Sequence, residues 1–139
     1  MIPSLFLLAL QFINPPAVHK PTGYTHAVKP AGCQHVFLSG QVALDAKGQP
    51  VGKDDFRAQA EQVFRNLEEV VKAAGGGFRD VVKMNSYVVG LTPDRLQELR
   101  TVRAKFLPQE NPPASTLIGV VALARPDFLL EVEAVACVK

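Results

Sequence analysis

The sequence predicts an α+β domain in which two helices pack on one side of a β-sheet. Two segments carry apolar side chains at intervals of three and four residues, as amphipathic helices do. Several shorter segments have the apolar, β-branched composition of strands, and strands and helices alternate along the chain. Each helix has one apolar face that must be buried against a sheet, so both helices are expected on the same side. At 139 residues the chain is long enough for one domain with its own core.

The N-terminal segment is predicted to stand outside this domain. Residues 1–11 form an apolar extension, and residues 12–139 form the single domain. Leu5 to Leu10 is shorter than the apolar core of about 7–15 residues in a secretory signal, and no Lys or Arg precedes it. A signal peptide, an extra strand, a frayed extension and a start-site artefact all stay open. No other stretch approaches the length that spans a membrane, so no membrane partner is expected.

The first part of the domain is predicted to be extended. Residues 12–23 hold three prolines, which indicates an edge strand or an extended arm. Residues 23–28 form a short strand, and a longer strand runs from His35 to Leu44. Gly40 interrupts that strand, which indicates either a β-bulge or a close approach of a ligand to the backbone.

The first helix is predicted over residues 54–75. Its apolar side chains form one stripe: Phe56, Ala60, Val63, Phe64, Leu67, Val71 and Ala74. Asp54 or Asp55 caps its start, and three successive glycines end it. The glycines are not followed by the Lys and Ser/Thr of a phosphate loop, so they are interpreted as a helix stop.

A strand and a second helix follow. The strand is predicted over residues 78–90, and Thr92 with Pro93 begins the helix. The helix ends before Pro108 and presents one apolar face, made of Leu96, Leu99, Val102 and Phe106. Two apolar runs complete the chain, Thr116–Leu123 and Phe128–Val138. The short Ala-Arg-Pro-Asp connection between them predicts a β-hairpin.

Composition limits the partners and the compartment. Fifteen basic and thirteen acidic side chains give a net charge of +2 without a dense basic cluster, so no nucleic-acid partner is expected. The two cysteines, Cys33 and Cys137, are interpreted as free thiols in a reducing, cytoplasmic environment. The three histidines, His19, His26 and His35, are seven and nine residues apart, unlike a helical metal site. No metal is therefore expected.

Four motifs, taken in order, resemble the RidA (YjgF) family of reactive-intermediate enamine/imine deaminases. They are GYTHAV, VFLSGQVALDAKGQPVG, DVVKMNSYVV, and PPAST followed after a turn by LLEVEAVA. The similarity extends from about Phe12 to Val138. It implies a chorismate-mutase-like fold with a mixed sheet and two helices on one face. It also implies a homotrimer with small-molecule sites between subunits and no cofactor.

The resemblance assigns roles to particular residues. Tyr24 would wall the pocket and orient the substrate, with a core aromatic as the alternative. Ser39 and Gly40 match the Ser-Gly of the family motif, where a ligand approaches the backbone. Glu131 would position the water that hydrolyses an imine, and a structural carboxylate is its alternative. Glu133, two residues along the same strand face, is expected to serve the sheet or a subunit contact.

One position departs from the family. Imine-deaminating members have Pro-Ala-Arg, whose arginine grips the substrate carboxylate, whereas here Ser115 follows Pro113 and Ala114. The chain is therefore similar to an arginine-less subfamily. Arg103 or Arg100 is a candidate replacement, and a solvated helix surface is the alternative for both. The backbone of Leu117 is expected to offer a hydrogen bond to substrate or water.

The expected function is that of a cofactor-free hydrolase acting on a small imine or enamine metabolite and releasing ammonia and a carbonyl compound. The alternative is a trimer that binds a small metabolite without turnover. The ribonuclease activity associated with the family has the weakest support, because the sequence has no histidine pair at hydrolytic spacing and no basic stripe with aromatics.

Overall fold

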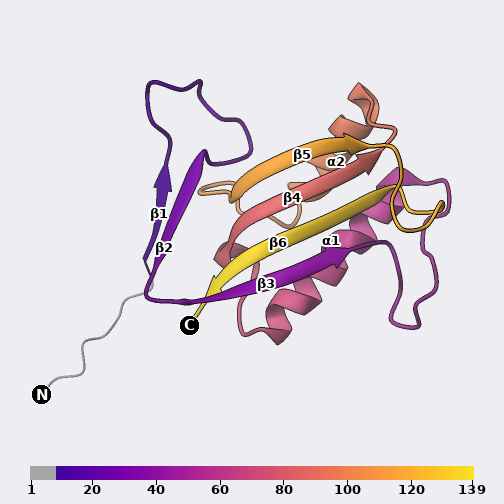
Figure 1. Cartoon of the computed structure of the whole chain (residues 1–139), viewed down its shortest axis with the longest axis horizontal. Helices are drawn as coiled ribbons and strands as arrows, with labels where there is room; N and C mark the ends of the chain where they lie inside the picture. Colours follow the sequence, from indigo (N-terminus) through magenta and orange to yellow (C-terminus); the bar gives the residue numbers. More distant parts are fainter. Residues whose placement is uncertain (1–8) are drawn as a thin grey trace, which may run out of the picture.

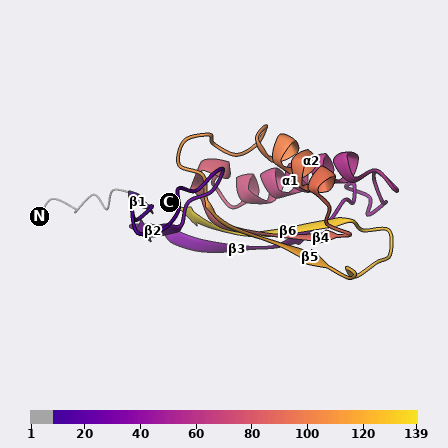
Figure 2. The same ribbon diagram turned by 90° about the horizontal axis from the view of Figure 1, so that it is seen from above.

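The computed structural model describes residues 9–139 and is an α+β fold with a mixed sheet, as predicted (Figure 1). The strands are β1 (Ala9–Ile13), β2 (Ala27–Ala31), β3 (Gln34–Gln41), β4 (Val81–Val89), β5 (Ala114–Val120) and β6 (Leu130–Val138). The helices are α1 (Phe56–Ala73), a 3₁₀ turn η1 (Phe78–Asp80) and α2 (Pro93–Arg103). Seen from above, both α-helices cover one face of the main sheet and leave the other face open (Figure 2).

The predicted C-terminal hairpin is wrong. The main sheet has the order β3-β6-β4-β5, so β4 lies between the two strands that were expected to pair. β5 runs parallel to β4, and β6 runs antiparallel to both β4 and β3. The turn residues predicted a chain reversal, but a reversal does not specify which strand the returning chain joins. Here the connection passes the end of β4.

A buried glutamine of α1 holds that connection in place. The amide nitrogen of Gln59 donates to the carbonyl of Asp127 at 2.8 Å and to that of Gly52 at 3.1 Å. Its amide oxygen accepts the backbone N–H of Leu129 at 2.9 Å. Gln59 is only 1% exposed, so these bonds satisfy polar groups that would otherwise be buried without partners.

Both helices begin where the sequence predicts, but α2 ends at Arg103, several residues before the predicted end next to Pro108. The Asp55 carboxylate accepts from the Ala58 backbone N–H at 2.9 Å, and Gly75 follows the last turn of α1 with φ +90°. The predicted stripe of α1, apart from Ala74 at its C-cap, is buried against the sheet and α2. The centroid of the Phe64 ring lies 5.5 Å from that of Phe106 and 6.2 Å from that of Phe78, so one aromatic cluster joins α1, the turn after α2, and η1.

The N-terminal part forms an arm rather than a strand of the main sheet. β1 and β2 pair antiparallel beside the end of that sheet (Figure 1). The predicted strand over residues 23–28 lies later, at Ala27–Ala31, where an edge position tolerates Pro30. The loop between β1 and β2 contacts the start of β5, where Thr25 donates its N–H to the carbonyl of Pro113 at 3.1 Å.

β1 also crosses the predicted boundary between the extension and the domain at residue 11. Most of the leucine-rich run that was weighed as a signal peptide lies outside the described residues. Within residues 9–139, no helix is both long enough and apolar enough to cross a bilayer.

The prediction of two free thiols is wrong. Cys33 and Cys137 form a disulfide with a Cα–Cα distance of 5.4 Å. The cause is the register of β3 with β6, which sets His35 opposite Cys137 and brings the preceding turn alongside. A separation of 104 residues in sequence hides this proximity. The cytoplasmic location therefore stays a prediction, without the support that free thiols would have provided.

Opening this disulfide is expected to lower the free energy of unfolding by about 2–4 kcal/mol, because the bond restrains a long loop of the unfolded chain. Thermal unfolding followed by circular dichroism, with and without dithiothreitol, measures the effect. The double variant Cys33→Ala, Cys137→Ala should match the reduced wild type and should not respond to reductant. A wild-type melting temperature that is the same in both conditions would contradict the prediction.

Candidate functional site

A cleft between α2, β5 and the arm brings together four of the predicted site residues. It has a volume of about 170 Å³ and is lined by Tyr24, Leu96, Leu99, Arg100, Arg103, Ser115 and Leu117. Ser115 and Leu117 lie opposite the buried Met84 and Ser86 of β4, so their side chains point to the helix side of the sheet. The arm supplies Tyr24 to the same cleft, next to the edge strand β5.

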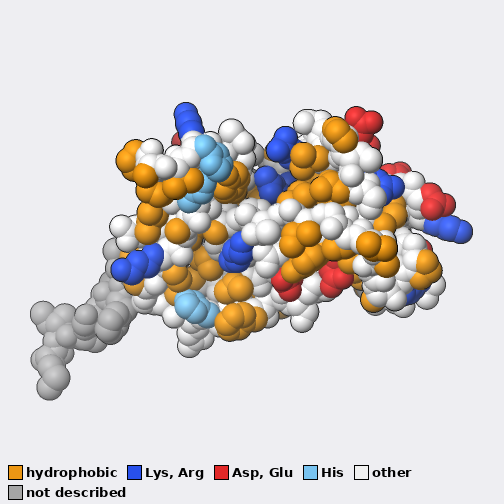
Figure 3. Space-filling model, turned by 45° about the horizontal axis from the view of Figure 1, so that its top comes forward, with side chains coloured by type: hydrophobic (Ala, Val, Ile, Leu, Met, Phe, Trp, Pro, Cys, Tyr) orange, Lys and Arg blue, Asp and Glu red, His pale blue; other side chains and the backbone are white. Residues whose placement is uncertain are grey.

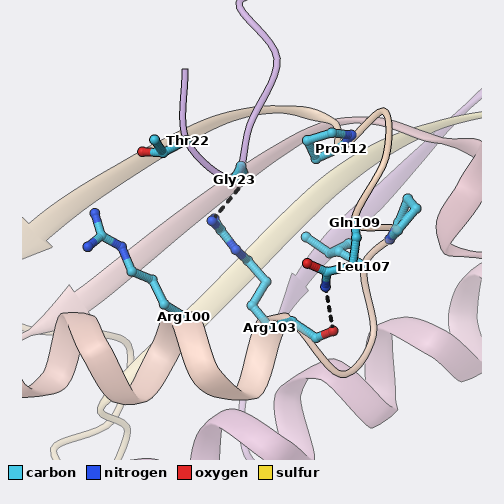
Figure 4. A pocket seen from close by; sticks show the side chains of 9 residues that line it. Thr22, Gly23, Arg100, Arg103, Leu107, Gln109 and Pro112 are labelled. Carbon is cyan, nitrogen blue, oxygen red and sulfur yellow. Dashed lines mark hydrogen bonds between the residues drawn. The ribbon is translucent and has the colours of Figure 1, made fainter. Parts of the chain in front are cut away.

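The guanidinium of Arg103 lies against Ser115, the position where the resemblance expects an arginine. Its Nη1 is 3.4 Å from the Ser115 hydroxyl oxygen, and its Nη2 donates to the carbonyl of Gly23 at 3.0 Å (Figure 4). Gly23 has φ +74°, and an added Cβ there would lie 3.1 Å from the same nitrogen. A glycine at this point of the arm therefore serves both the backbone conformation and the approach of Arg103.

Arg103 carries an uncompensated positive charge. Its pKa is lowered, first by burial and then by the nearby charge of Arg100. Among residues 9–139, no carboxylate lies within 4.0 Å of either guanidinium. Arginine keeps its proton in proteins, so the cleft holds a half-buried cation without a protein counter-ion.

The hydroxyl of Tyr24 has a partner that sequence reasoning missed. The Nε2 atom of His19 lies 2.6 Å from it, and the ring of His26 packs edge-on against both rings. His26 Nε2 in turn bonds the carbonyl of His19 at 2.8 Å. The spacing of the histidines in sequence, which argues against a helical metal site, gives no sign of this contact. Figure 3 shows the histidine side chains of the arm gathered together.

Glu131, Ser39 and Gly40 lie on the opposite face of the sheet. Glu131 is opposite Tyr87 of β4, whose side chain alternates with the buried helix-side residues, and so it points to the open face. The register shifts between Leu38 and Gln41, so Gly40 sits in a bulge. A Cβ on Gly40 would lie 2.0 Å from Oε1 of Glu131. The close approach at Gly40 is therefore made by a side chain of the same molecule.

The predicted site residues thus form two separate groups within a single chain. The cleft has the cation, Ser115, Leu117 and Tyr24, and the open sheet face has Glu131 with Ser39 and Gly40. Because neighbouring residues of a strand point to opposite faces, no side-chain rearrangement within one chain joins them. Within residues 9–139, no three His, Cys, Asp or Glu side chains are grouped as a metal site.

The open face also carries a hydrogen-bonded carboxylate. Oε1 of Glu133 accepts from the Tyr87 hydroxyl at 2.6 Å and from the Asn85 amide at 2.9 Å. These bonds, Asn85 first, lower the pKa of Glu133, and the same carboxylate raises the pKa of Tyr87. Phe37 is 79% exposed and lines, with Asn85 and Glu133, a cavity of about 210 Å³. Apolar side chains with acidic ones among them spread over the sheet in Figure 3.

The structure is that of an α+β protein with a mixed four-stranded sheet, two helices on one face of that sheet and a cleft at its edge strand β5. The chain belongs to the RidA (YjgF, RutC) family. Residues 15–138 match the family model described as Endoribonuclease L-PSP. A RutC family protein of Pyrococcus horikoshii is 33% identical over 118 residues, which cover 84% of this chain and 89% of that protein.

Other relatives agree with this assignment. A 2-iminobutanoate/2-iminopropanoate deaminase of Dermatophagoides farinae is 28% identical over 93% of this chain and 97% of its own length. The crystal structure of YyfB from Yersinia pestis, a protein of unknown function of the Rid family, superposes with a TM-score of 0.87 at 39% identity. It covers 93% of this chain and 98% of that one. RidA from an Antarctic Psychrobacter is 32% identical with a TM-score of 0.67, over 92% and 99% of the two chains.

The lowered pKa of Glu133 predicts a pH dependence of stability. A depressed folded-state pKa contributes stability that is complete above the ordinary value of 4.5 and is lost as the pH falls through the folded value. The variant Glu133→Gln should therefore be less stable than wild type near neutral pH, and the difference should shrink as the pH falls below 4.5. Urea unfolding at a series of pH values measures this, with Glu110→Gln as the exposed control. A difference that stays constant with pH would contradict it.

Proposed function

We propose that this protein is a cofactor-free hydrolytic deaminase of a small imine or enamine, releasing ammonia and a carbonyl compound. The observation that carries the proposal is the guanidinium of Arg103 beside Ser115. In this interpretation α2 supplies the substrate-binding cation that other members of the family carry on β5. The relative named as a 2-iminobutanoate/2-iminopropanoate deaminase supports the reaction class.

Arg103 is well placed to bind a carboxylate. Its guanidinium is oriented by the hydrogen bond to the carbonyl of Gly23, so less side-chain entropy is lost when a substrate binds. The contact to the Ser115 hydroxyl is long for a hydrogen bond and is readily exchanged for a carboxylate oxygen. The cleft would thus anchor one end of an imino acid.

The chemistry needs water and a route for protons. Water adds to the imine carbon, its proton passes to a base, and the resulting carbinolamine expels ammonia as the carbonyl forms. We assign the base to Glu131, because a positioned carboxylate can hold water and accept its proton. We assign proton donation to the leaving nitrogen to the Tyr24 hydroxyl, which His19 would reprotonate through their 2.6 Å contact. An enamine would first take a proton at carbon and become the imine.

Two chains would have to build one such site. The anchor lies on the helix side of the sheet and the water-binding carboxylate lies on the open side, so a second copy must bring its Glu131 to the cleft. The exposed Phe37 on that open face favours association through it, because a monomer would leave this ring in water. We propose that the assembly is the homotrimer that the family resemblance implies.

A binding protein without turnover is the second candidate, favoured by one observation. Within the single chain, no carboxylate lies within 4.0 Å of the cleft guanidiniums, among the residues described. If the chains do not assemble so as to bring Glu131 to the cleft, the cation could bind a metabolite without a base to activate water.

Replacing Arg103 should impair hydrolysis of enzymatically generated 2-iminobutyrate. We expect Arg103→Ala to lower kcat/KM about ten- to a hundredfold, because a charge-assisted hydrogen bond is worth about 1.5–3 kcal/mol. Adding Ser115→Arg to that variant should restore part of the rate, since it returns the cation to β5. Arg57→Ala, which removes only an exposed ion pair 3.9 Å long, is the matched control. Unchanged kinetics in Arg103→Ala would rule out the anchor.

A mixing experiment tests whether two chains share one site. Arg103→Ala and Glu131→Gln are each expected to retain at most about a tenth of wild-type activity as pure proteins. Equal amounts of the two variants, unfolded together and refolded, should recover about a quarter of wild-type activity. Random assembly places an intact Arg103 beside an intact Glu131 in about a quarter of the shared sites. Light scattering on the same samples should give a multiple of the 15.0 kDa chain mass. No recovery from an assembled mixture would place both groups within one chain.

A further inference from the structure

Two arginines, rather than one, line the cleft region. Arg100 and Arg103 stand one turn apart on α2 and both line the cleft with Tyr24 and Ser115. Both also line a second cavity of about 250 Å³, on the other side of Arg103, with Thr22, Gly23 and Gln109 among its walls. Together the two cavities approach the size of small-ligand sites, roughly 300–1,000 Å³. In Figure 4 both side chains rise from α2 toward the arm.

Arg100 has no partner in the part of the chain that the structure describes. No carboxylate lies within 4.0 Å of it, and its side chain makes no hydrogen bond among residues 9–139. Three other arginines have a carboxylate partner: Arg57 and Arg65 contact Glu61, and Arg125 forms two hydrogen bonds with Asp127. Arg79 and Arg95 lack one among residues 9–139, but only Arg100 and Arg103 line the same two cavities.

The position of Arg103 on its helix does not account for its burial. Basic residues in the last turn of a helix gain about 0.3–1 kcal/mol from the helix dipole. That gain is available to an exposed side chain such as Arg100, yet Arg103 is half-buried and directed at Gly23 rather than into solvent. Two like charges three residues apart also repel each other. An anion that contacts both guanidiniums would relieve that repulsion.

We propose that the substrate of this protein carries two anionic groups, one bound by Arg103 beside Ser115 and the other bound by Arg100 and the Thr22 hydroxyl in the adjoining cavity. The inference rests on the proposed function and narrows its substrate class to small imino or enamino dicarboxylates or their phosphate-bearing analogues. Residues three apart on a helix have Cβ atoms about 5–6 Å apart. That spacing suits two anions joined by two or three carbon atoms.

Binding of unreactive acids tests the second anion site without turnover. Isothermal titration at low salt would compare glutarate, which has two carboxylates, with butyrate, which has one. Wild type should bind glutarate about ten- to a hundredfold more tightly. Arg100→Ala should remove this preference by weakening glutarate far more than butyrate, whereas Arg103→Ala should weaken both ligands. Arg57→Ala is the control and should match wild type.

Equal affinities of wild type for the two acids, or no binding of either, would overturn the inference. So would a preference that persists in Arg100→Ala. A third ligand, 3-phosphonopropionate, separates the two sources of the second anion. If 3-phosphonopropionate binds more tightly than glutarate and Arg100→Ala abolishes the difference, the second site exists and is assigned to a phosphate. If it binds more weakly than glutarate and its binding still depends on Arg100, the second site is assigned to a carboxylate.

Turnover separates this inference from the proposed function. The rates of 2-iminoglutarate and 2-iminobutyrate hydrolysis would be compared in wild type and Arg100→Ala. Equal rates on both imines in wild type leave the deaminase proposal standing and overturn the second anion site. Glutarate binding that depends on Arg100, without hydrolysis of either imine, would support the second anion site and overturn the deaminase proposal.

Discussion

The position of β4 between β5 and β6 is the constraint on which the rest of the structure depends. Its helix-side residues, including Met84 and Val88, are fully buried and form the floor on which α1 and α2 pack. Its other side carries Asn85 and Tyr87, which hold Glu133. Because β5 and β6 both pair with β4, the side chains of each also alternate between the helix side and the open side of the sheet. β5 then presents Ser115 to the helices, and β6 presents Glu131 to the open face.

Much of the fold followed from local patterns in the sequence. The stripe and caps of α1, the start of α2 and the extended, proline-rich arm are determined by neighbouring residues, so spacing alone predicts them. The hairpin and the free thiols failed for one shared reason, which is that both depend on strand order. β6 pairs with β3 and β4 and not with β5, and this pairing sets Cys137 beside Cys33. No local pattern encodes a contact over 104 residues.

The candidate site shows the same limit. One cleft is lined by four of the residues that the motifs indicated, although they come from an arm, a strand and a helix: Tyr24, Ser115, Leu117 and Arg103. The contact of His19 with Tyr24 depends on the loop geometry of the arm, which the sequence pattern leaves undetermined. Glu131 is separated from the cleft because its side chain on β6 and the Ser115 side chain on β5 point to opposite faces of the sheet. This can be worked out only when the registers of both strands with β4 are known.

The departure at Ser115 and the presence of Arg103 are best understood together. The side chain of an arginine at residue 115 would run past the point where Nη1 of Arg103 now lies, 3.4 Å from the serine oxygen, and the two cations in one cleft would repel. A small, neutral residue at this point of β5 removes that repulsion and leaves space for the side chain from α2. That side chain brings its cation into the cleft from the helix, one turn from Arg100. In our proposal the cleft therefore presents two positive charges from one helix, and it favours an anion of higher charge.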